Sequence, residues 1–431
     1  MLKEQPIETQ DKQEQKPDKE QKEKYLPVGI DPGKNICGVV LLHPDSGNDT
    51  VLSSMFMDNC SFEDADALIA ESRPSGRERA EKVANSFGLK PIFVIEATNI
   101  LWRPLFSYLK SKGCLVHTVC ATQTKSSRGT KMRKTKTDLI DAKHIARIYK
   151  QGESHPTKFP EGIHMDLREL VRLHSFFTDM KGRILNRVYG YLFQVFPEFV
   201  SFFNSNSFLG TMWTLLKEGL VHPDCLQKVR IDKLTSILRK ASMGRFKREK
   251  AIMLKEKARN SFGISEGREG FSSCLKLLAC MYEFVEKSIA CLEEDKIKPI
   301  VDQIPNKLNT IKGLGIAQAY FLAESRKPEE YENVDDVVAW FGFDPRLSES
   351  AGKKKKNRHI SKCGTKYGRE AMFLSTDMVM IHNPTVMVKY RRLRKNGRTN
   401  REAKTIIAAD LVKACYSMQR DNVPFNPSLI H

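Results

Sequence analysis

The feature that most constrains this chain is an alternation of short apolar runs and longer helical stretches between Tyr25 and Lys150. The run YLPVGIDPGKNICGVVLL indicates a strand, a glycine-rich kink at Gly29–Gly33 and a continuing strand. Further strands are predicted at Thr50–Met57, Pro91–Ala97 and Cys114–Val119, and helices at Phe62–Phe87, Leu101–Lys112 and Thr137–Lys150. Such an alternation predicts an α/β domain with a mixed sheet and helices packed on it.

The rest of the chain is predicted to be helical, apart from its polar beginning. Residues 1–24 are rich in Gln, Glu, Lys and Asp and contain almost nothing apolar, so we expect a disordered tail. Met165–Phe196 has the periodicity of a long basic amphipathic helix, typical of an arm that follows a nucleic-acid duplex or forms a dimer. From Ser201 to about Asp302 the pattern stays helical and includes the basic segment LRKASMGRFKREKAIMLKEKAR.

Nearer the C-terminus, the segment IKGLGIAQAYFLAE combines a Gly-x-Gly turn with an apolar helix, as helix-hairpin-helix units do. In such units, backbone N–H groups at a helix N-terminus hold a phosphate. A glycine-rich turn between two packed helices would have the same sequence, so both interpretations stay open.

The charge of the chain points to a polyanionic partner. Lys and Arg number 71 against 52 Asp and Glu, a formal net charge of +19. No apolar window approaches the ~18 residues of a spanning helix, and the first residues lack the apolar core of a signal peptide. We therefore expect nucleic acid as the partner and no membrane. The ten cysteines show no zinc-like spacing and are expected to be reduced thiols of a cytoplasmic protein.

Four acidic residues could carry chemistry. Asp31 stands beside glycines in a predicted strand, Glu96 ends another strand, and Asp138 and Asp141 share one face of a predicted helix. Clustered carboxylates repel one another unless cations neutralise them, and hard oxygen ligands suit Mg²⁺ or Mn²⁺. Two such ions stabilise the attacking and leaving oxygens of a phosphodiester, which predicts an architecture of the ribonuclease-H type. Taken singly, Asp31 could shape a turn, Glu96 could pair with a basic residue and Asp138 could cap its helix.

Two basic segments accompany these acids. The first is the loop before Asp138, with cations at Lys125, Arg128, Lys131, Arg133, Lys134 and Lys136. Phosphate contacts from such a loop would position a nucleic-acid backbone without reading its sequence. The second segment, SESAGKKKKNRHISKCGTKYGRE, sets Ser348 and Ser350 among cations that could stabilise charge on a phosphate. Its cations are Lys353, Lys354, Lys355, Lys356, Arg358, Lys362 and Arg369. Solvated charge runs or a flexible basic loop would look the same.

Several of these motifs occur together in one known family. In their order and rough spacing, GIDPGK, VIEA, KTDLIDAKHIAR, IKGLG…A…LAE and SAGKKKKNRHISKCGTKYGRE resemble the DEDD-type insertion-sequence transposases. These form the one-ten family of bacterial mobile elements, which are bridge-RNA-guided serine recombinases. The resemblance covers roughly Leu26 to Ser417, although the helical middle, about Phe202–Asp302, is long for the family.

The resemblance implies a fold and a set of parts. We expect an α/β ribonuclease-H-like domain, similar to the Holliday-junction resolvases, a helical coiled-coil linker, and a mainly α C-terminal transposase domain with a helix-hairpin-helix-like element. The corresponding ranges are a disordered tail at 1–24, the acidic domain at 25–155, the linker with an insertion at 156–300, and the serine-bearing domain at 301–431.

The resemblance also implies roles for single residues. The acidic tetrad that holds the metal falls on Asp31, Glu96, Asp138 and Asp141. The catalytic serine, which bonds covalently to DNA, falls on Ser350, with Ser348 as the less favoured choice, and Arg369 would lie near the scissile phosphate. The acids of one subunit would face the serine of another, so a homodimer or homotetramer is implied, together with a structured guide RNA that chooses donor and target DNA.

The expected function is therefore a Mg²⁺-dependent serine recombinase, with Mn²⁺ as the alternative ion, that excises and inserts its own element. It would act in the bacterial cytoplasm and be associated with the nucleoid when bound to DNA. One alternative is a junction-resolving nuclease in which the tetrad activates water and Ser350 is only a loop residue. A further alternative is a non-catalytic nucleic-acid-binding protein, for which the basic surface would suffice.

Overall fold

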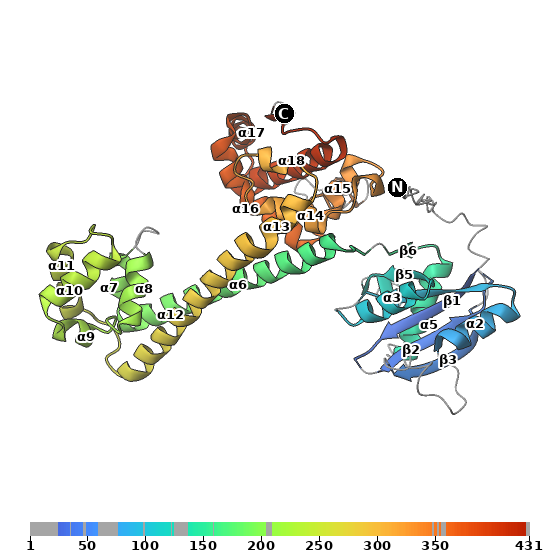
Figure 1. The fold of residues 1–431 in the computed structure, drawn as a ribbon, viewed down its shortest axis with the longest axis horizontal. Coiled ribbons are helices and arrows are strands. Elements are labelled where there is room, and N and C mark those ends of the chain that lie inside the picture. The colour runs from blue at the N-terminus through green and yellow to red at the C-terminus, as the bar shows by residue number, and fades with distance from the viewer. Residues whose placement is uncertain are drawn as a thin grey trace, which may run out of the picture. The chain divides into compact units, whose positions relative to one another are not determined.

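The computed structural model forms two compact units, Met1–Phe159 and Pro160–His431 (Figure 1). It describes residues 25–34, 36–45, 49–58, 76–97, 100–121, 123–124, 137–157, 159–203, 209–346, 349–350, 353–354 and 359–427. The predicted tail and the basic loop before Asp138 lie outside these residues, as does the part of the predicted helix Phe62–Phe87 that precedes Gly76.

The first unit is built on a six-stranded mixed sheet with the order β3-β2-β1-β4-β5-β6. Its strands are β1 (Tyr25–Pro32), β2 (Ile36–Leu42), β3 (Val51–Asp58), β4 (Lys90–Glu96), β5 (Leu115–Val119) and β6 (His155–Pro156). Strands β1, β4 and β5 are parallel neighbours, whereas β2, β3 and β6 each run antiparallel to the strand before them in the chain. The predicted mixed sheet is therefore confirmed.

One detail of the first strand prediction is wrong. The chain does not continue in one direction after the glycines but turns back, so β2 pairs antiparallel with β1. The turn is too tight for a side chain at Gly33, where a Cβ atom would lie 2.1 Å from the carbonyl oxygen of Ile36. A glycine-rich kink and a glycine-rich reversal look alike in sequence, because periodicity carries no information on strand direction.

Helices cover both faces of this sheet. On one face lie α2 (Gly76–Ser86) and α3 (Trp102–Ser111), which pack with Leu26, Ile30 and Phe93 of the strands. On the other face lies α5 (Asp138–Lys150), whose Ile145 packs with Val94 and whose Ala142 and Ala146 pack with Val40 and Leu42. The unit thus has three layers, and α5 is the helix that brings its acids to the sheet.

The second unit is almost wholly helical. Its first part contains α6 (Ile163–Val195), α7 (Pro197–Phe202), α8 (Leu209–Lys217), α9 (Pro223–Lys228), α10 (Ile231–Ala241), α11 (Arg248–Arg259) and α12 (Arg268–Cys291). A π-helical segment, η4 (Leu292–Ile297), leads to α13 (Lys298–Gln303), α14 (Ala317–Glu324), α15 (Val334–Trp340), α16 (Lys366–His382), α17 (Pro384–Lys395) and α18 (Asn400–Asp421). Two short strands, β7 (Glu349–Ser350) and β8 (Lys353–Lys354), form a separate ladder.

Two hydrophobic cores hold the second unit together, and α6 contributes to both. Leu167 and Val171, near its start, pack among α13 to α18. Val188 and Leu192, near its end, pack among α7 to α12. Figure 1 shows α6 and α12 side by side between these two groups of helices. No helix in the described ranges is long and apolar enough to span a membrane.

Candidate functional site

Asp31 and Glu96 end two adjacent parallel strands. The register pairs Ile30 of β1 with Ile95 of β4, so the two acids that follow lie side by side at the carboxyl ends of these strands. Successive side chains of a strand point to opposite faces. Val94 packs against α5, so Glu96, two residues on, points to the same face, where its side chain is largely buried.

Two glycines let α5 approach this face closely. A Cβ atom at Gly29 would lie 2.0 Å from the carbonyl oxygen of Ala142, and one at Gly38 would lie 2.9 Å from the carbonyl group of Asp138. Gly38 is the register partner of Asp31, which places the backbone of Asp138 above the row that holds Asp31 and Glu96. A side chain at either glycine would push the helix, and its acids, away from the sheet.

The N-terminal turn of α5 carries the other two acids. Thr137 caps this helix, and its hydroxyl accepts a hydrogen bond from the Ile140 N–H at 3.3 Å. Asp138 is exposed, whereas Asp141, one turn on, is 1% exposed. The partial positive charge of a helix N-terminus favours carboxylates in its first turn. The structure therefore brings Asp31, Glu96, Asp138 and Asp141 to one face and one end of the sheet.

The charge of Asp31 is felt by a neighbouring thiol. Burial raises the pKa of Cys37, a backbone hydrogen bond at Gly33 opposes this rise, and the negative charge of Asp31 adds to it. The carboxylate of Asp31 thus lies close to β2, the strand that also contains Gly38.

The donor set of this site consists of carboxylate oxygens, which are the ligands that Mg²⁺ and Mn²⁺ prefer. In the part of the chain that the structure describes, no three His, Cys, Asp or Glu side chains already converge as metal ligands. The carboxylate chemistry of the four acids and the adjacent backbone positions of Asp31, Glu96 and Asp138 fit a divalent cation.

The predicted serine lies in the second unit, on a β-hairpin. Near its base, Pro345 forms a bridge with Ile360, and the Ser361 N–H donates to the Asp344 carbonyl at 2.8 Å. Further along, β7 and β8 pair antiparallel, with Ser350 opposite Lys353 and Glu349 opposite Lys354. The structure gives the backbone of these residues. Ser348, Lys355, Lys356 and Arg358, as well as the loop residues Lys125, Arg128, Lys131, Arg133, Lys134 and Lys136, lie outside the described residues.

Lys362 and Arg369 follow this hairpin. Lys362 is exposed and has a φ of 56°, in the left-handed region. Arg369, in the first turn of α16, is half-buried, and its guanidinium donates to the carbonyl oxygen of Phe341 at 3.2 Å. Burial lowers the pKa of this guanidinium. Its partner carbonyl fixes the guanidinium beside the start of α16, close in sequence to the hairpin.

A residue that the sequence analysis missed organises this region. Glu324, at the end of α14, is buried and accepts two hydrogen bonds from Arg172 of α6, at 2.8 and 3.1 Å. It also accepts a hydrogen bond from the hydroxyl of Thr365, at 2.8 Å. Burial lowers the pKa of Arg172, but the hydrogen bond and charge of Glu324 outweigh it and leave that pKa raised. The only signal in the sequence is an acid at the end of an apolar helix.

Thr365 connects Glu324 to α16, the helix that carries Arg369. It is the N-cap of α16, and its side chain accepts a hydrogen bond from the Gly368 N–H. Trp340 also donates its indole N–H to the backbone carbonyl of Glu324, at 2.6 Å. Glu324 therefore joins α6, α14, α15 and the start of α16, the helix that carries Arg369.

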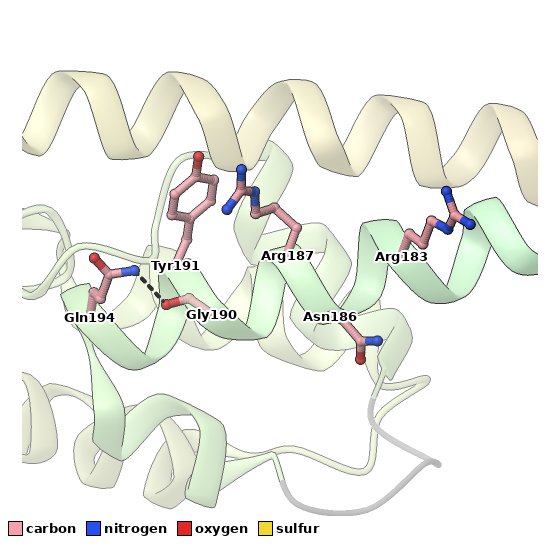
Figure 2. A pocket seen from close by; sticks show the side chains of 6 residues that line it. All are labelled: Arg183, Asn186, Arg187, Gly190, Tyr191 and Gln194. Atoms are coloured by element: carbon pink, nitrogen blue, oxygen red, sulfur yellow. Dashed lines mark hydrogen bonds between the residues drawn. The ribbon is translucent and has the colours of Figure 1, made fainter. Parts of the chain in front are cut away.

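The polar side of α6, predicted as part of a basic arm, contains a shallow hollow (Figure 2). Arg183, Arg187 and Tyr191 point toward the neighbouring helix, whereas Asn186 points away from it. The guanidinium of Arg187 stacks over the Tyr191 ring at 5.3 Å, and Tyr191 in turn packs edge to face with Phe271 of α12. The two aromatic rings and Arg187 thus help to join the two long helices.

Comparisons with known proteins give two family models and a solved structure. A family model described as a transposase, of the DEDD type of IS110, matches residues 28–197, and the model of the transposase IS116/IS110/IS902 family matches residues 306–391. Among solved structures, T. thermophilus RuvC in complex with a Holliday junction substrate matches with a TM-score of 0.22 and 16% identity, over 31% of this chain and 99% of that chain. A search of curated proteins gives no significant match.

The first unit is an α/β domain with a mixed sheet and an acid-bearing helix, and the second unit is mainly helical, as the predicted fold class requires. The chain as a whole is a DNA-processing enzyme of the transposase class. It belongs to the IS110 family of transposases, whose two family models together match more than half of its length.

Proposed function

We propose that this transposase excises and inserts its element by serine-mediated strand exchange at a site where the acidic tetrad faces Ser350. The observation that supports this most is the row formed by Asp31 and Glu96 at the carboxyl ends of β1 and β4, with the backbone of Asp138 above it. Neighbouring acids, of which Glu96 and Asp141 are buried, cost electrostatic free energy unless a cation neutralises them. A fold maintained for stability alone gains nothing from this row.

In this proposal Asp31, Glu96, Asp138 and Asp141 hold Mg²⁺, with Mn²⁺ as an alternative. Divalent ions at such a site neutralise charge on the attacking and leaving oxygens of a phosphodiester. The protein's own part is to fix the four carboxylates in position, because phosphoryl transfer depends mostly on positioning and electrostatics.

Ser350 is the proposed nucleophile. Its hydroxyl oxygen attacks the phosphorus of the scissile phosphodiester and loses its proton, a bond forms between that oxygen and phosphorus, and the bond to the leaving sugar oxygen breaks. The leaving oxygen takes up a proton and later attacks the serine phosphodiester of an exchanged strand. Each step replaces one phosphoester bond with another, so strand exchange requires no energy source.

The assembly and its guide belong to the same proposal. The tetrad and Ser350 lie in different units of the chain, so acids of one subunit can face the serine of another in a homodimer or homotetramer. Lys353, Lys354, Lys362 and Arg369 would contact the DNA backbone near Ser350, and the loop Lys125–Lys136 would contact it near the tetrad. A structured RNA transcribed from the element would select donor and target.

The test is incubation of purified protein with its element's junction DNA, Mg²⁺ and the RNA from the element's flank, with products resolved on a denaturing gel. We expect a shifted DNA band that protease removes and that is absent in Ser350→Ala and Asp138→Asn. Ser348→Ala serves as the matched control and should retain the band. Full product formation by Ser350→Ala would refute the nucleophile assignment. Product without added RNA would refute guidance.

One observation favours a second candidate function, a junction-resolving nuclease that uses water. All four acids lie in the first unit, so the ribonuclease-H-like domain could cleave without the serine. Cleavage that persists in Ser350→Ala and never yields a protease-sensitive band would support this candidate over strand exchange.

A further inference from the structure

The small helical bundle in the middle of the chain has an unusual charge. The segment between residues 228 and 259 contains twelve Lys and Arg but only three Asp and Glu. This segment spans α10, α11 and the turn between them, far along the chain from both the tetrad and Ser350. Clustered like charges oppose folding unless the fold itself uses them.

Three of the cations have structural roles. The Lys250 ammonium lies over the rings of Phe202 and Phe246, 4.9 and 6.0 Å from their centroids. Lys255 donates to the backbone carbonyls of Gln227 and Val229, at 2.9 and 2.6 Å. Arg248 forms an ion pair with Asp232. These contacts join α11 to α7, α9 and α10.

Of the other nine cations, five belong to α10 and the turn that follows it. They are all exposed, and across the ranges that the structure describes none of them forms an ion pair: Lys233, Arg239, Lys240, Arg245 and Lys247. Three belong to α10 and two to the turn that follows it. Beside them lies a shallow hollow lined by Arg239 and Lys240 together with the hydroxyl-bearing Thr235 and Ser236. Asp232 also lines it, but the charge of this carboxylate is paired with Arg248.

The fold holds this surface in place. Leu234 and Leu238 are fully buried, which turns the opposite side of α10, with Lys233 and Lys240, to the solvent. Phe246 anchors the turn in the core, and its N–H donates to the Ser242 hydroxyl at 2.8 Å. From Lys233 to Lys240 the helix rises about 10 Å, at about 1.5 Å per residue. That length is about three steps along a nucleic-acid strand, at about 3.4 Å each.

We propose that the exposed side of α10 and the α10–α11 turn bind the phosphate backbone of a nucleic acid, as a site separate from the catalytic one. Cations and hydroxyls in a shallow hollow contact phosphates without reading bases. DNA and RNA present the same phosphate chemistry, so the test must distinguish them. This site does not depend on which nucleophile the enzyme uses.

The test measures the affinity of the full-length Ser350→Ala protein, in EDTA, for a labelled DNA duplex of arbitrary sequence and for a labelled RNA hairpin. The variant K233Q/R239Q/K240Q/R245Q removes four of the five cations, all at exposed positions. We expect its binding to be about tenfold weaker and the slope of log K against log salt to fall by about two to four. Weaker binding of both probes supports a site that accepts either polymer. Weaker binding of one probe alone supports a site for that polymer.

The matched control removes the same charge elsewhere in the second unit. K276Q/K287Q/K296Q/K307Q changes four exposed lysines of α12, η4 and the turn after α13, which form no ion pair within the described ranges. Equal weakening by this control would show that only total charge matters and would overturn the proposal, as would unchanged binding of the α10 variant. Far-ultraviolet circular dichroism should be the same for all the proteins. Because no metal or catalytic serine is present, the result is independent of the proposed chemistry.

Discussion

At the residue scale, the strongest structural dependence is that of the second unit on Glu324. Its side chain is 1% exposed and makes contacts with Arg168 and Arg172 of α6 and with Thr365 at the start of α16. A buried ion pair contributes little net stability compared with apolar residues, but loss of one partner leaves the other charge buried and unpaired. Removal of the Glu324 side chain should therefore cost more free energy of unfolding than the ion pair itself contributes.

We expect Glu324→Ala to lower the free energy of unfolding of the second unit by about 3–5 kcal/mol, because Arg172 would lose its counter-charge. Urea denaturation followed by circular dichroism measures this change. The double variant Glu324→Ala/Arg172→Met should recover part of the loss, because Arg168, whose Nε lies 3.8 Å from the Glu324 carboxylate, still loses this ion pair. A single-variant cost below about 1 kcal/mol, the range of an exposed pair, would contradict this account.

At the element scale, the approach of α5 to the sheet determines where two of the acids lie. We expect Gly38→Ala to displace α5, because the added methyl group would lie 2.9 Å from the Asp138 carbonyl. The free energy of unfolding should fall by about 1–3 kcal/mol, the usual cost of overpacking. Hydrogen exchange of the α5 amides measures the displacement, and activity should fall with it.

Gly182→Ala is the matched control, because a Cβ atom at this position of α6 would have no neighbour within 4 Å. In a helix interior, alanine is favoured over glycine by about 1 kcal/mol, so this variant should be as stable as the parent or more so. Unchanged α5 exchange in Gly38→Ala would mean that the close packing seen here does not position the acids.

Much of the fold at this scale could be predicted from sequence. The apolar run before Glu96 and the periodicity after Thr137 placed β4 and α5 within a residue or so of their observed bounds. The direction of β2 could not be predicted, because it depends on a turn, and the two-residue β6 has no apolar run to mark it.

The candidate site was predictable in its residue types but not in its supports. The four acids could be found from the sequence because they stand in or at the ends of strongly patterned strands and at the start of a patterned helix. The need for glycine at positions 29 and 38 arises from contact with a helix about a hundred residues later in the chain. Glu324 has its partner 152 residues away, in α6, and no local pattern reports such a contact. The roles of Ser350 and of the loop before Asp138 stay predictions.

At the scale of the whole molecule, the cores of the two units are separate. Phe93 lies in a cluster made wholly of first-unit residues, and Phe321 lies in one made wholly of second-unit residues. We expect two thermal transitions in calorimetry. Phe93→Ala and Phe321→Ala, each worth about 3–5 kcal/mol, should each shift a different one. A single transition that both variants shift equally would show that the units unfold together.

Helix α6 joins the two cores of the second unit as one piece of 33 residues. Each residue of an α-helix advances about 100° around the axis, so the stripe at Leu167 and Val171 and the stripe at Val188 and Leu192 have a fixed angular phase. One inserted residue between them would rotate one stripe about 100° out of its core, whereas seven would leave an error of only about 20°. The spacing between the two helical groups can therefore change during evolution only in steps close to a whole number of helical turns, such as about seven, eleven or eighteen residues, with matching changes in α12.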